Sequence, residues 1–140
     1  MQPSVHVIAT TADGTRAALT AAAPLARGAG ASLVVLVPHV VSSQAELELP
    51  EASAAAIVRR YEEIARGLGT EATVEIVASV GLVDLVARAC AAGSRIVVGG
   101  PVGRWLTSPE ERFANRLAAL GCSVLFAASG RNTTQRRVAA

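Results

Sequence analysis

The sequence predicts a doubly wound α/β domain in three layers, with a five-stranded parallel sheet between two layers of helices. Five short β-rich segments alternate with four segments whose apolar residues recur every three or four positions. This alternation is typical of parallel strands joined by right-handed helical crossovers. One β-rich segment, 33–37, is an unbroken apolar run, as expected of a strand buried on both faces.

The order of the predicted elements is strand, helix, strand, helix, strand, helix, strand, helix, strand. The strands are expected at 4–9, 33–37, 73–78, 96–98 and 123–128, and the helices at 15–27, 57–68, 83–90 and 108–120. Because apolar and polar residues alternate along 73–78, we place that strand at an edge of the sheet. Ser108, Pro109 and Glu111 form a strong helix start, with a capping box between Ser108 and Glu111. The polar segment 39–50 is expected to be a connection.

Charge and composition exclude several classes of function. All 13 basic residues are arginines, and the absence of lysine excludes Schiff-base chemistry and the phosphate-binding lysine of a P-loop. The expected domain, 1–128, has a net charge near zero and is a poor match for nucleic acid. We expect 129–140, which holds Arg131, Arg136 and Arg137 without an acid, to be a disordered basic tail.

The sequence also bears on location and redox state. No apolar stretch approaches the roughly 20 residues that span a bilayer, and no signal peptide precedes the first strand. We therefore expect a cytoplasmic protein without a membrane partner. Cys90 and Cys122, the only cysteines, have no close spacing, so we expect two buried reduced thiols and no metal site.

In a doubly wound sheet, ligands bind beyond the carboxyl ends of the strands, where the strand order reverses. The loop that follows the fourth strand holds Gly100 and Gly103, whose backbone could approach a phosphate, followed by Arg104 as a charged donor. A tight turn into the next helix explains the same glycines without any ligand. Glu110 and Glu111, in the first turn of that helix, would repel a phosphate bound there.

Other candidate residues have both a binding and a structural interpretation. Asp13 could bind a ribose or a metal-bridged phosphate, or it could form a turn, and either Asp13 or Thr11 could cap the first helix. His39 could contact a ligand, although a hydrogen-bonded structural histidine is the stronger interpretation. His6, inside the first strand, is expected to be structural.

Catalytic signatures are absent from the sequence. There is no G-x-G-x-x-G after the first strand, no G-x-S-x-G nucleophile elbow and no H-x-G-H motif of nucleotidyl transferases. The acidic pair and lysine of a phospho-receiver are missing as well. We predict neither catalytic residues nor metal ligands.

Several segments, in this order and spacing, resemble the universal stress protein family across nearly all of 4–128. Residues 36–41 (LVPHVV) resemble the end of that family's second strand, and 93–100 (GSRIVVGG) resemble its G-A-D-L-I-V-V-G segment. Residues 80–82 (VGL) are similar to the start of a G-x-P-x-x-x-I segment without the proline. Residues 122–126 (CSVLF) resemble the closing C-P-V-L-V.

The resemblance implies a Rossmann-like fold of the adenine-nucleotide α-hydrolase type and a homodimer formed through the last strand. One branch of that family binds ATP through an aspartate after the first strand and a G-x-x-G motif followed, nine residues later, by G-S or G-T. Here Gly100 and Gly103 match, Thr107 and Ser108 are nearest to the closing pair in a shortened loop, and the aspartate position falls on Thr10 or, by a local shift, on Asp13.

The resemblance thus implies a nucleotide crevice with an altered motif, with ATP or AMP as the candidate ligand. Its candidate binding residues are Thr10, Asp13, His39, Val40, Val41, Gly100, Gly103, Arg104, Thr107 and Ser108. Three hypotheses remain open: a non-catalytic stress-response regulator that acts as a dimer, an AMP- or ATP-binding sensor, and a slow nucleotide hydrolase.

Overall fold

The computed structural model, which describes residues 3–91, 93–130 and 135–138 (of 135–137 the backbone only), is a three-layer α/β domain. The described strands lie in the order β3-β2-β1-β4-β5-β6, and the first five are parallel, as predicted. The strands are β1 (Ser4–Ile8), β2 (Ser32–Val41), β3 (Thr73–Val80), β4 (Ser94–Gly100), β5 (Val124–Ala128) and β6 (Gln135–Arg137). The helices are α1 (Ala12–Ala29), η1 (Gln44–Glu46, a 3-10 turn), α2 (Glu51–Gly67), α3 (Val83–Ala89) and α4 (Pro109–Ala119).

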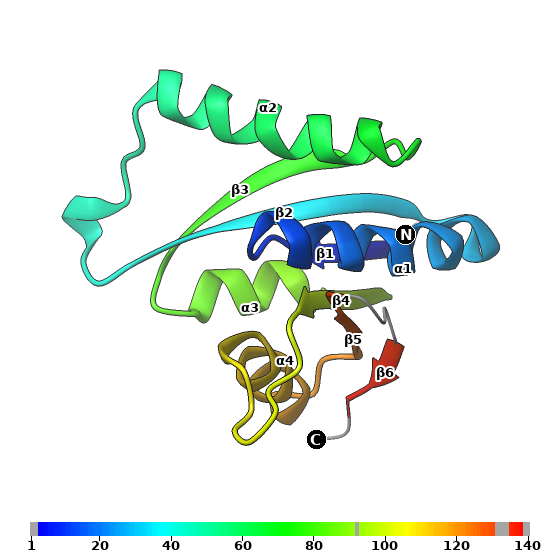
Figure 1. Ribbon diagram of the computed structural model, residues 1–140. Coiled ribbons are helices and arrows are strands. Elements are labelled where there is room, and N and C mark those ends of the chain that lie inside the picture. Colours follow the sequence, from blue (N-terminus) through cyan, green and yellow to red (C-terminus); the bar gives the residue numbers. More distant parts are fainter. Residues whose placement is uncertain (1–2, 92, 131–134, 139–140) are drawn as a thin grey trace.

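Each face of the sheet has its own apolar core (Figure 1). On one face, Val7, Val35 and Val97 are buried beneath α1 and α2. On the other face, Leu85 of α3 and Leu117 of α4 pack against the alternate strand residues. Because successive side chains of a strand point to opposite faces, both sets of side chains of the central strands are buried and mostly apolar, with His6 of β1 a polar exception. This explains the continuous apolar run of β2.

The helix starts follow local capping chemistry. Thr11 caps α1, since its side chain accepts a hydrogen bond from the amide of Gly14 at 3.0 Å, while Asp13 lies in the first turn. Ser108 and Glu111 form the predicted capping box of α4, with Pro109 at the first helical position. Both features satisfy amides that an α-helix leaves without partners at its start.

Strand β2 is longer than the apolar run predicted and includes His39, Val40 and Val41. Its pairing with β1 ends at Ile8↔Leu36, whereas its pairing with β3 continues to Val41↔Val80. Beyond β1, strand β2 therefore has a neighbour on one side only, where the missing amide of Pro38 is tolerated. Strand β3 lies at the edge of the sheet, as predicted. The ends of β2 and β3 together form a two-stranded ribbon that projects past the rest of the sheet (Figure 1).

The end of the chain differs from the expected tail. Gln135–Arg137 form β6, which pairs antiparallel with β5, so the expectation of disorder over 129–140 is wrong for these residues. Residues 131–134 and 139–140 lie outside the described residues. Strand β5 is consequently not a free edge, and Val124 and Phe126 are buried inside the chain at 4% and 2% exposure. The premise of a dimer through an open last strand does not hold for β5.

The two cysteines are also different from the expectation. Cys90 and Cys122 form a disulfide, with their Cα atoms 5.4 Å apart, where two reduced thiols were predicted. Cys90 ends α3 shortly before β4, and Cys122 shortly precedes β5. Because β4 and β5 are neighbours, with the amide of Ile96 bonded to the carbonyl of Ser123 at 2.8 Å, the sheet brings two sequence-distant cysteines together. Their spacing of 32 residues gave no local signal.

Candidate functional site

The predicted crevice lies where the strand order reverses, between the carboxyl ends of β1 and β4. Strand β1 leads into α1 on one face of the sheet, and β4 leads into α4 on the other face. At this edge Thr10 follows β1, and Gly100 ends β4. The topology thus places two predicted site residues where ligands bind in doubly wound sheets.

Hydrogen bonds of Thr10 close this edge. Its hydroxyl donates to the carbonyl of Gly99 at 2.7 Å, which links the end of β1 to β4. Its amide donates to the hydroxyl of Thr15 at 3.1 Å, and its carbonyl accepts a long bond of 3.5 Å from the hydroxyl of Tyr61 on α2. Every polar group of Thr10 is therefore used inside the protein.

The main chain fills the space beside Thr10. A Cβ atom on Gly14 would overlap the carbonyl oxygen of Gly99, and a Cβ on Gly99 would overlap the carbonyl oxygen of Gly14. The first turn of α1 can lie this close to the end of β4 because neither Gly14 nor Gly99 has a Cβ atom. The approach is backbone to backbone.

The loop between β4 and α4 binds an internal anion. The carboxylate oxygen Oε1 of Glu111 accepts hydrogen bonds from the amide of Gly103 at 2.7 Å and the amide of Ser108 at 2.9 Å. The Ser108 hydroxyl in turn accepts from the amide of Glu111 at 3.1 Å. Amides at a helix start are the groups that bind phosphate in nucleotide-binding loops. Here they already hold the carboxylate of Glu111, which is only 5% exposed.

The shape of this loop fits the tight-turn interpretation. A Cβ on Gly103 would overlap the carbonyl oxygen of Leu106, so the chain doubles back at that point. A Cβ on Gly100 would overlap the side chain of Glu110. The Oε2 atom of Glu110 is buried there, without a hydrogen-bond partner in the described structure. Two acidic side chains thus pack against the glycines that were predicted to approach a phosphate.

Arg104 and Thr107 lie on the outer side of the same loop and are exposed. The carbonyl of Thr107 accepts a hydrogen bond of 2.7 Å from Nη1 of Arg112. Among the described contacts, none joins Arg104 to the amides of Gly103 or Ser108.

Three other predicted residues lie on the projecting β2–β3 ribbon rather than at the β1–β4 edge. His39 is half-buried, and its Nε2 donates to the carbonyl of Glu46 at 3.2 Å, as the structural interpretation predicts. Val40 is 45% exposed, and Val41 is half-buried. No described hydrogen bond joins the ribbon to the loop that contains Gly103.

Asp13 also points away from the crevice. It is exposed, and its carboxylate accepts a hydrogen bond of 2.9 Å from Nη1 of Arg16, with which it forms an ion pair on the surface of α1. Thr11, and not Asp13, therefore caps α1, and Asp13 forms an exposed ion pair with Arg16.

A partly buried polar group lies on the face of the sheet that α3 covers, and the sequence pointed only to its member His6. His6 is 1% exposed; its Nδ1 donates to the carbonyl of Ala89 at 2.9 Å, and its Nε2 accepts from Nη1 of Arg88 at 3.2 Å. Arg88 also binds both carboxylate oxygens of Glu75, at 3.0 and 2.7 Å. Burial, followed by the nearby Arg88 charge, lowers the pKa of His6, although its bond to Ala89 opposes the shift. The group ties β1, β3 and α3 together.

The hydrogen bonds to Arg88 lower the pKa of Glu75, and the same bonds raise the pKa of Arg88. Sequence patterning could not identify this group because its members come from three separate elements. It has no opening toward the predicted crevice among the described contacts, and we treat it as structural.

One groove lies far from the predicted crevice. An open groove of about 970 Å³ lies between the carboxyl-terminal ends of α1 and α2, and Arg27, Glu62 and Arg66 are among the residues that line it. It is at the amino ends of β2 and β3, opposite the edge predicted to bind a ligand. In the described ranges no three His, Cys, Asp or Glu side chains gather in a way that could hold a metal ion. No described helix has the length and apolar composition to cross a membrane.

Comparison with known proteins connects this geometry to one fold. No protein-family model and no curated protein sequence matches the chain. Solved structures do match. The universal stress protein UspA from Lactobacillus plantarum is 17% identical, with a TM-score of 0.58, and the match covers 90% of this chain and 98% of that chain.

Two further structures agree. A universal stress protein from Archaeoglobus fulgidus is 17% identical with a TM-score of 0.58, covering 93% of this chain and 94% of that one. A universal stress protein in complex with cAMP is 18% identical with a TM-score of 0.57, covering 89% and 97%. The chain therefore has the doubly wound α/β fold of the universal stress proteins.

Proposed function

We propose that this chain is a non-catalytic, dimeric regulatory protein of the universal stress protein type, whose nucleotide crevice is degenerate. The observation that carries the proposal is the carboxylate of Glu111, which binds the amides of Gly103 and Ser108. A phosphate at these amides would have to displace a carboxylate held by two charge-assisted hydrogen bonds. The bond of 2.7 Å between Thr10 and Gly99 supports the same conclusion at the other side of the crevice.

An adenine-nucleotide sensor is the second candidate. It is favoured by one observation: a structure with the same fold is a universal stress protein in complex with cAMP. In this reading Thr10, Val40 and Val41 would lie near the base, and Gly100, Gly103, Arg104 and Ser108 would lie near the phosphate. The side chain of Glu111 would first have to leave the loop, which lowers affinity by the free energy of that opening.

Thermal unfolding with added nucleotide separates the two candidates. A ligand of the native state at a hundred times its Kd adds about 2.7 kcal/mol to the free energy of unfolding. We expect ATP, AMP and cAMP, each at millimolar concentration with and without Mg²⁺, to leave the unfolding midpoint unchanged. A nucleotide-dependent rise that is lost in Gly103→Val would instead establish the sensor. ATP turnover by the purified protein would contradict the non-catalytic assignment.

A cytoplasmic location remains part of the proposal. The cytosolic thiol systems keep most cysteines reduced. In that compartment we expect the Cys90–Cys122 disulfide to form only under oxidising conditions.

A further inference from the structure

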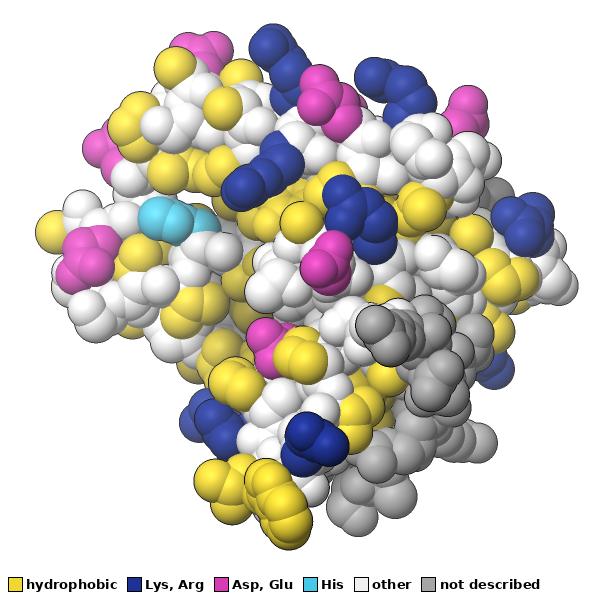
Figure 2. Space-filling view, viewed as in Figure 1, with side chains coloured by type: hydrophobic (Ala, Val, Ile, Leu, Met, Phe, Trp, Pro, Cys, Tyr) yellow, Lys and Arg dark blue, Asp and Glu magenta, His cyan; other side chains and the backbone are white. Residues whose placement is uncertain are grey.

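The loop before α4 carries an exposed apolar projection. Trp105 is 95% exposed, Leu106 82% and Val102 50%. Figure 2 shows a hydrophobic projection at the lower edge of the molecule, where Figure 1 places the loop between β4 and α4. Trp105 is also the only tryptophan of the chain. A fully exposed tryptophan next to an exposed leucine is typical of an interface residue rather than of a free surface.

This projection is held in place by the turn that supports it. Glu111 fixes the amide of Gly103 at 2.7 Å, and Arg112 fixes the carbonyl of Thr107 at 2.7 Å, on either side of Trp105. The close approach of Gly103 to Leu106 tightens the loop further. Because its shape is already set, docking of this loop loses little conformational entropy.

Basic residues lie on the loop that carries the projection and on the helix α4 that follows it. Arg104, Arg112 and Arg116 are exposed, and within the described chain they have no ion-pair partner. The neighbouring acids do not offset them at the surface, since Glu111 is buried and Glu110 packs over Gly100. We call the six residues Val102, Arg104, Trp105, Leu106, Arg112 and Arg116 the basic tip.

A second surface has the opposite charge. Glu46, Glu48, Glu51 and Asp84 are exposed near the carboxyl ends of β2 and β3, and none has an ion pair among the described residues. No arginine occurs between Arg27 and Arg59 to neutralise them. This surface is also partly apolar, with Val40 45% and Val83 75% exposed. We call the six residues Val40, Glu46, Glu48, Glu51, Val83 and Asp84 the acidic end.

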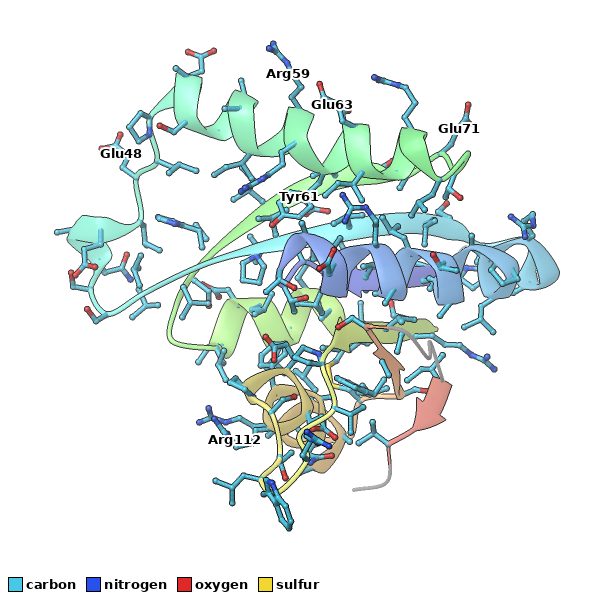
Figure 3. The ribbon with its side chains drawn as sticks, viewed as in Figure 1. Glu48, Arg59, Tyr61, Glu63, Glu71 and Arg112 are labelled. Carbon is cyan, nitrogen blue, oxygen red and sulfur yellow. A yellow bond between two sulfur atoms is a disulfide. The ribbon has the colours of Figure 1, made fainter. Side chains whose placement is uncertain are left out.

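Both surfaces open on the same side of the molecule. In Figure 3 Glu48 lies at the upper left, beside the segment before α2, and Arg112 at the lower left, on α4. A two-fold axis that lies in the plane of this side and passes midway between the two surfaces would bring the basic tip of each protomer against the acidic end of the other. Such a contact is made twice and closes on itself, as an isologous dimer requires.

We propose that the basic tip binds the acidic end of a second copy of this chain, with Trp105 as the apolar anchor. The proposal rests on the dimer of the proposed function and names its surface. It also accounts for a dimer whose β5 edge is already paired with β6. The contact has complementary charge and an apolar centre on both sides.

The test is the oligomeric state of the full chain, measured by light scattering and sedimentation over a concentration series. We expect Trp105→Ala to raise the dimer Kd about 30-fold, as for an interface hot spot. Since Trp105 is 95% exposed in the single chain, this variant should keep the unfolding midpoint of the parent protein at concentrations where both are monomeric. Emission of the single tryptophan should shift to shorter wavelength as the protein is concentrated, because dimerisation removes Trp105 from water.

Charge reversal identifies the two surfaces. Two double variants reverse the charge of one surface each: Arg104→Glu with Arg116→Glu, and Glu48→Arg with Glu51→Arg. Each should raise the dimer Kd at least about tenfold at low salt. Mixing the two variants should restore dimers, because in the mixed dimer the reversed tip meets the reversed end and the unreversed tip meets the unreversed end, so both contacts join opposite charges. Arg59→Glu with Arg95→Glu, exposed residues outside both surfaces, is the control of equal charge change.

The outcomes distinguish the surface from the dimer itself. If neither the charge reversals nor Trp105→Ala changes the dimer Kd, the proposed surface is overturned, but the dimer of the proposed function is not. A strict monomer at high concentration overturns both. A tryptophan shift caused by anionic phospholipid vesicles in the monomeric protein overturns the second copy as the occupant of the tip.

Discussion

At the scale of single residues, Glu111 makes the interactions that a bound phosphate would make. Its carboxylate lies at the start of α4, where the helix dipole favours negative charge, and it bonds two amides from within the chain. The capping box between Ser108 and Glu111 follows from the sequence, because its spacing is local. The bond to Gly103 does not, because it depends on how tightly the loop turns back at Leu106.

Glu111→Ala should both destabilise the protein and create an anion site. We expect the free energy of unfolding to fall by about 2 kcal/mol, since two amides lose a charged acceptor. Inorganic phosphate should then recover part of that loss in the variant and have no effect on the parent protein. Urea unfolding with and without phosphate measures both effects. Glu63→Ala, at an exposed position of α2, is the control. If phosphate does not change the free energy of unfolding of the Glu111→Ala protein, the carboxylate does not occupy an anion site.

His6 should make stability depend on pH. Its pKa in the folded protein is lowered from 6.5, mainly by burial, so the unfolded chain binds a proton that the folded chain does not. The stabilisation is fully present above pH 6.5 and decreases as the pH falls below it, with a limiting slope of about 1.4 kcal/mol per pH unit. Glu75, whose pKa is lowered from 4.5, adds a separate loss at more acidic pH.

Urea unfolding between pH 7.5 and 5 checks this dependence. In His6→Gln the slope between these values should be smaller, although the variant is less stable at every pH because it disturbs the bonds to Ala89 and Arg88. An unchanged slope in His6→Gln would assign the pH dependence to another group.

At the scale of elements, the five parallel strands and the four α-helices were predictable in order and direction because their apolar periods differ, whereas β6 and η1 were not predicted. The edge position of β3 followed from its alternation in the same way. The extent of β2 was not predictable, because Pro38 and His39 interrupt the apolar run, and only the one-sided pairing with β3 explains why the strand continues. The disulfide was not predicted because Cys90 and Cys122 are 32 residues apart in the sequence. They come together only because β4 and β5 are adjacent strands of the sheet.

The disulfide should stabilise the junction of α3 with β5. For two cysteines 32 residues apart, the chain-entropy relation gives about 4 kcal/mol of stabilisation. We expect dithiothreitol to lower the urea midpoint of the parent protein and to have no effect on the Cys90→Ser, Cys122→Ser double variant. Thiol titration should find no free thiol in the oxidised protein and two after reduction. Two reactive thiols in native, oxidised protein would contradict the bridge.

For the whole molecule, the position of the candidate site follows from topology alone, but topology does not decide whether the site is open or filled by the chain itself. Parallel strands bring Thr10 and Gly100 to one edge, as predicted. Whether that edge is open depends on the bond between Thr10 and Gly99 and on the packing of Gly14 against Gly99, which require the folded coordinates. His39, Val40 and Val41 were expected at the same mouth, and they lie at the carboxyl end of β2, on the part of the strand that extends beyond its pairing with β1.

The far edge of the molecule depends on β6. Strand β6 pairs with β5 through Leu125↔Arg137 and Ala127↔Gln135, and the amide of Val138 bonds to the carbonyl of Val124 at 3.1 Å. Removal of residues 131–140 would leave the backbone of β5 unpaired at the edge of a parallel sheet, and such edges recruit other strands. In a Trp105→Ala background, we therefore expect the shortened chain to associate with rising concentration and to lose amide-exchange protection along β5.

Loss of charge must be separated from loss of the strand, because the deleted segment carries Arg131, Arg136 and Arg137. In the same Trp105→Ala background, a full-length variant with these three arginines replaced by serine keeps a chain that can form β6 but removes the same charge. It should stay as dissociated as the Trp105→Ala protein and keep the protection of β5. If it associates as the shortened chain does, electrostatic repulsion by the tail, and not coverage of the edge by β6, keeps β5 from pairing with other chains.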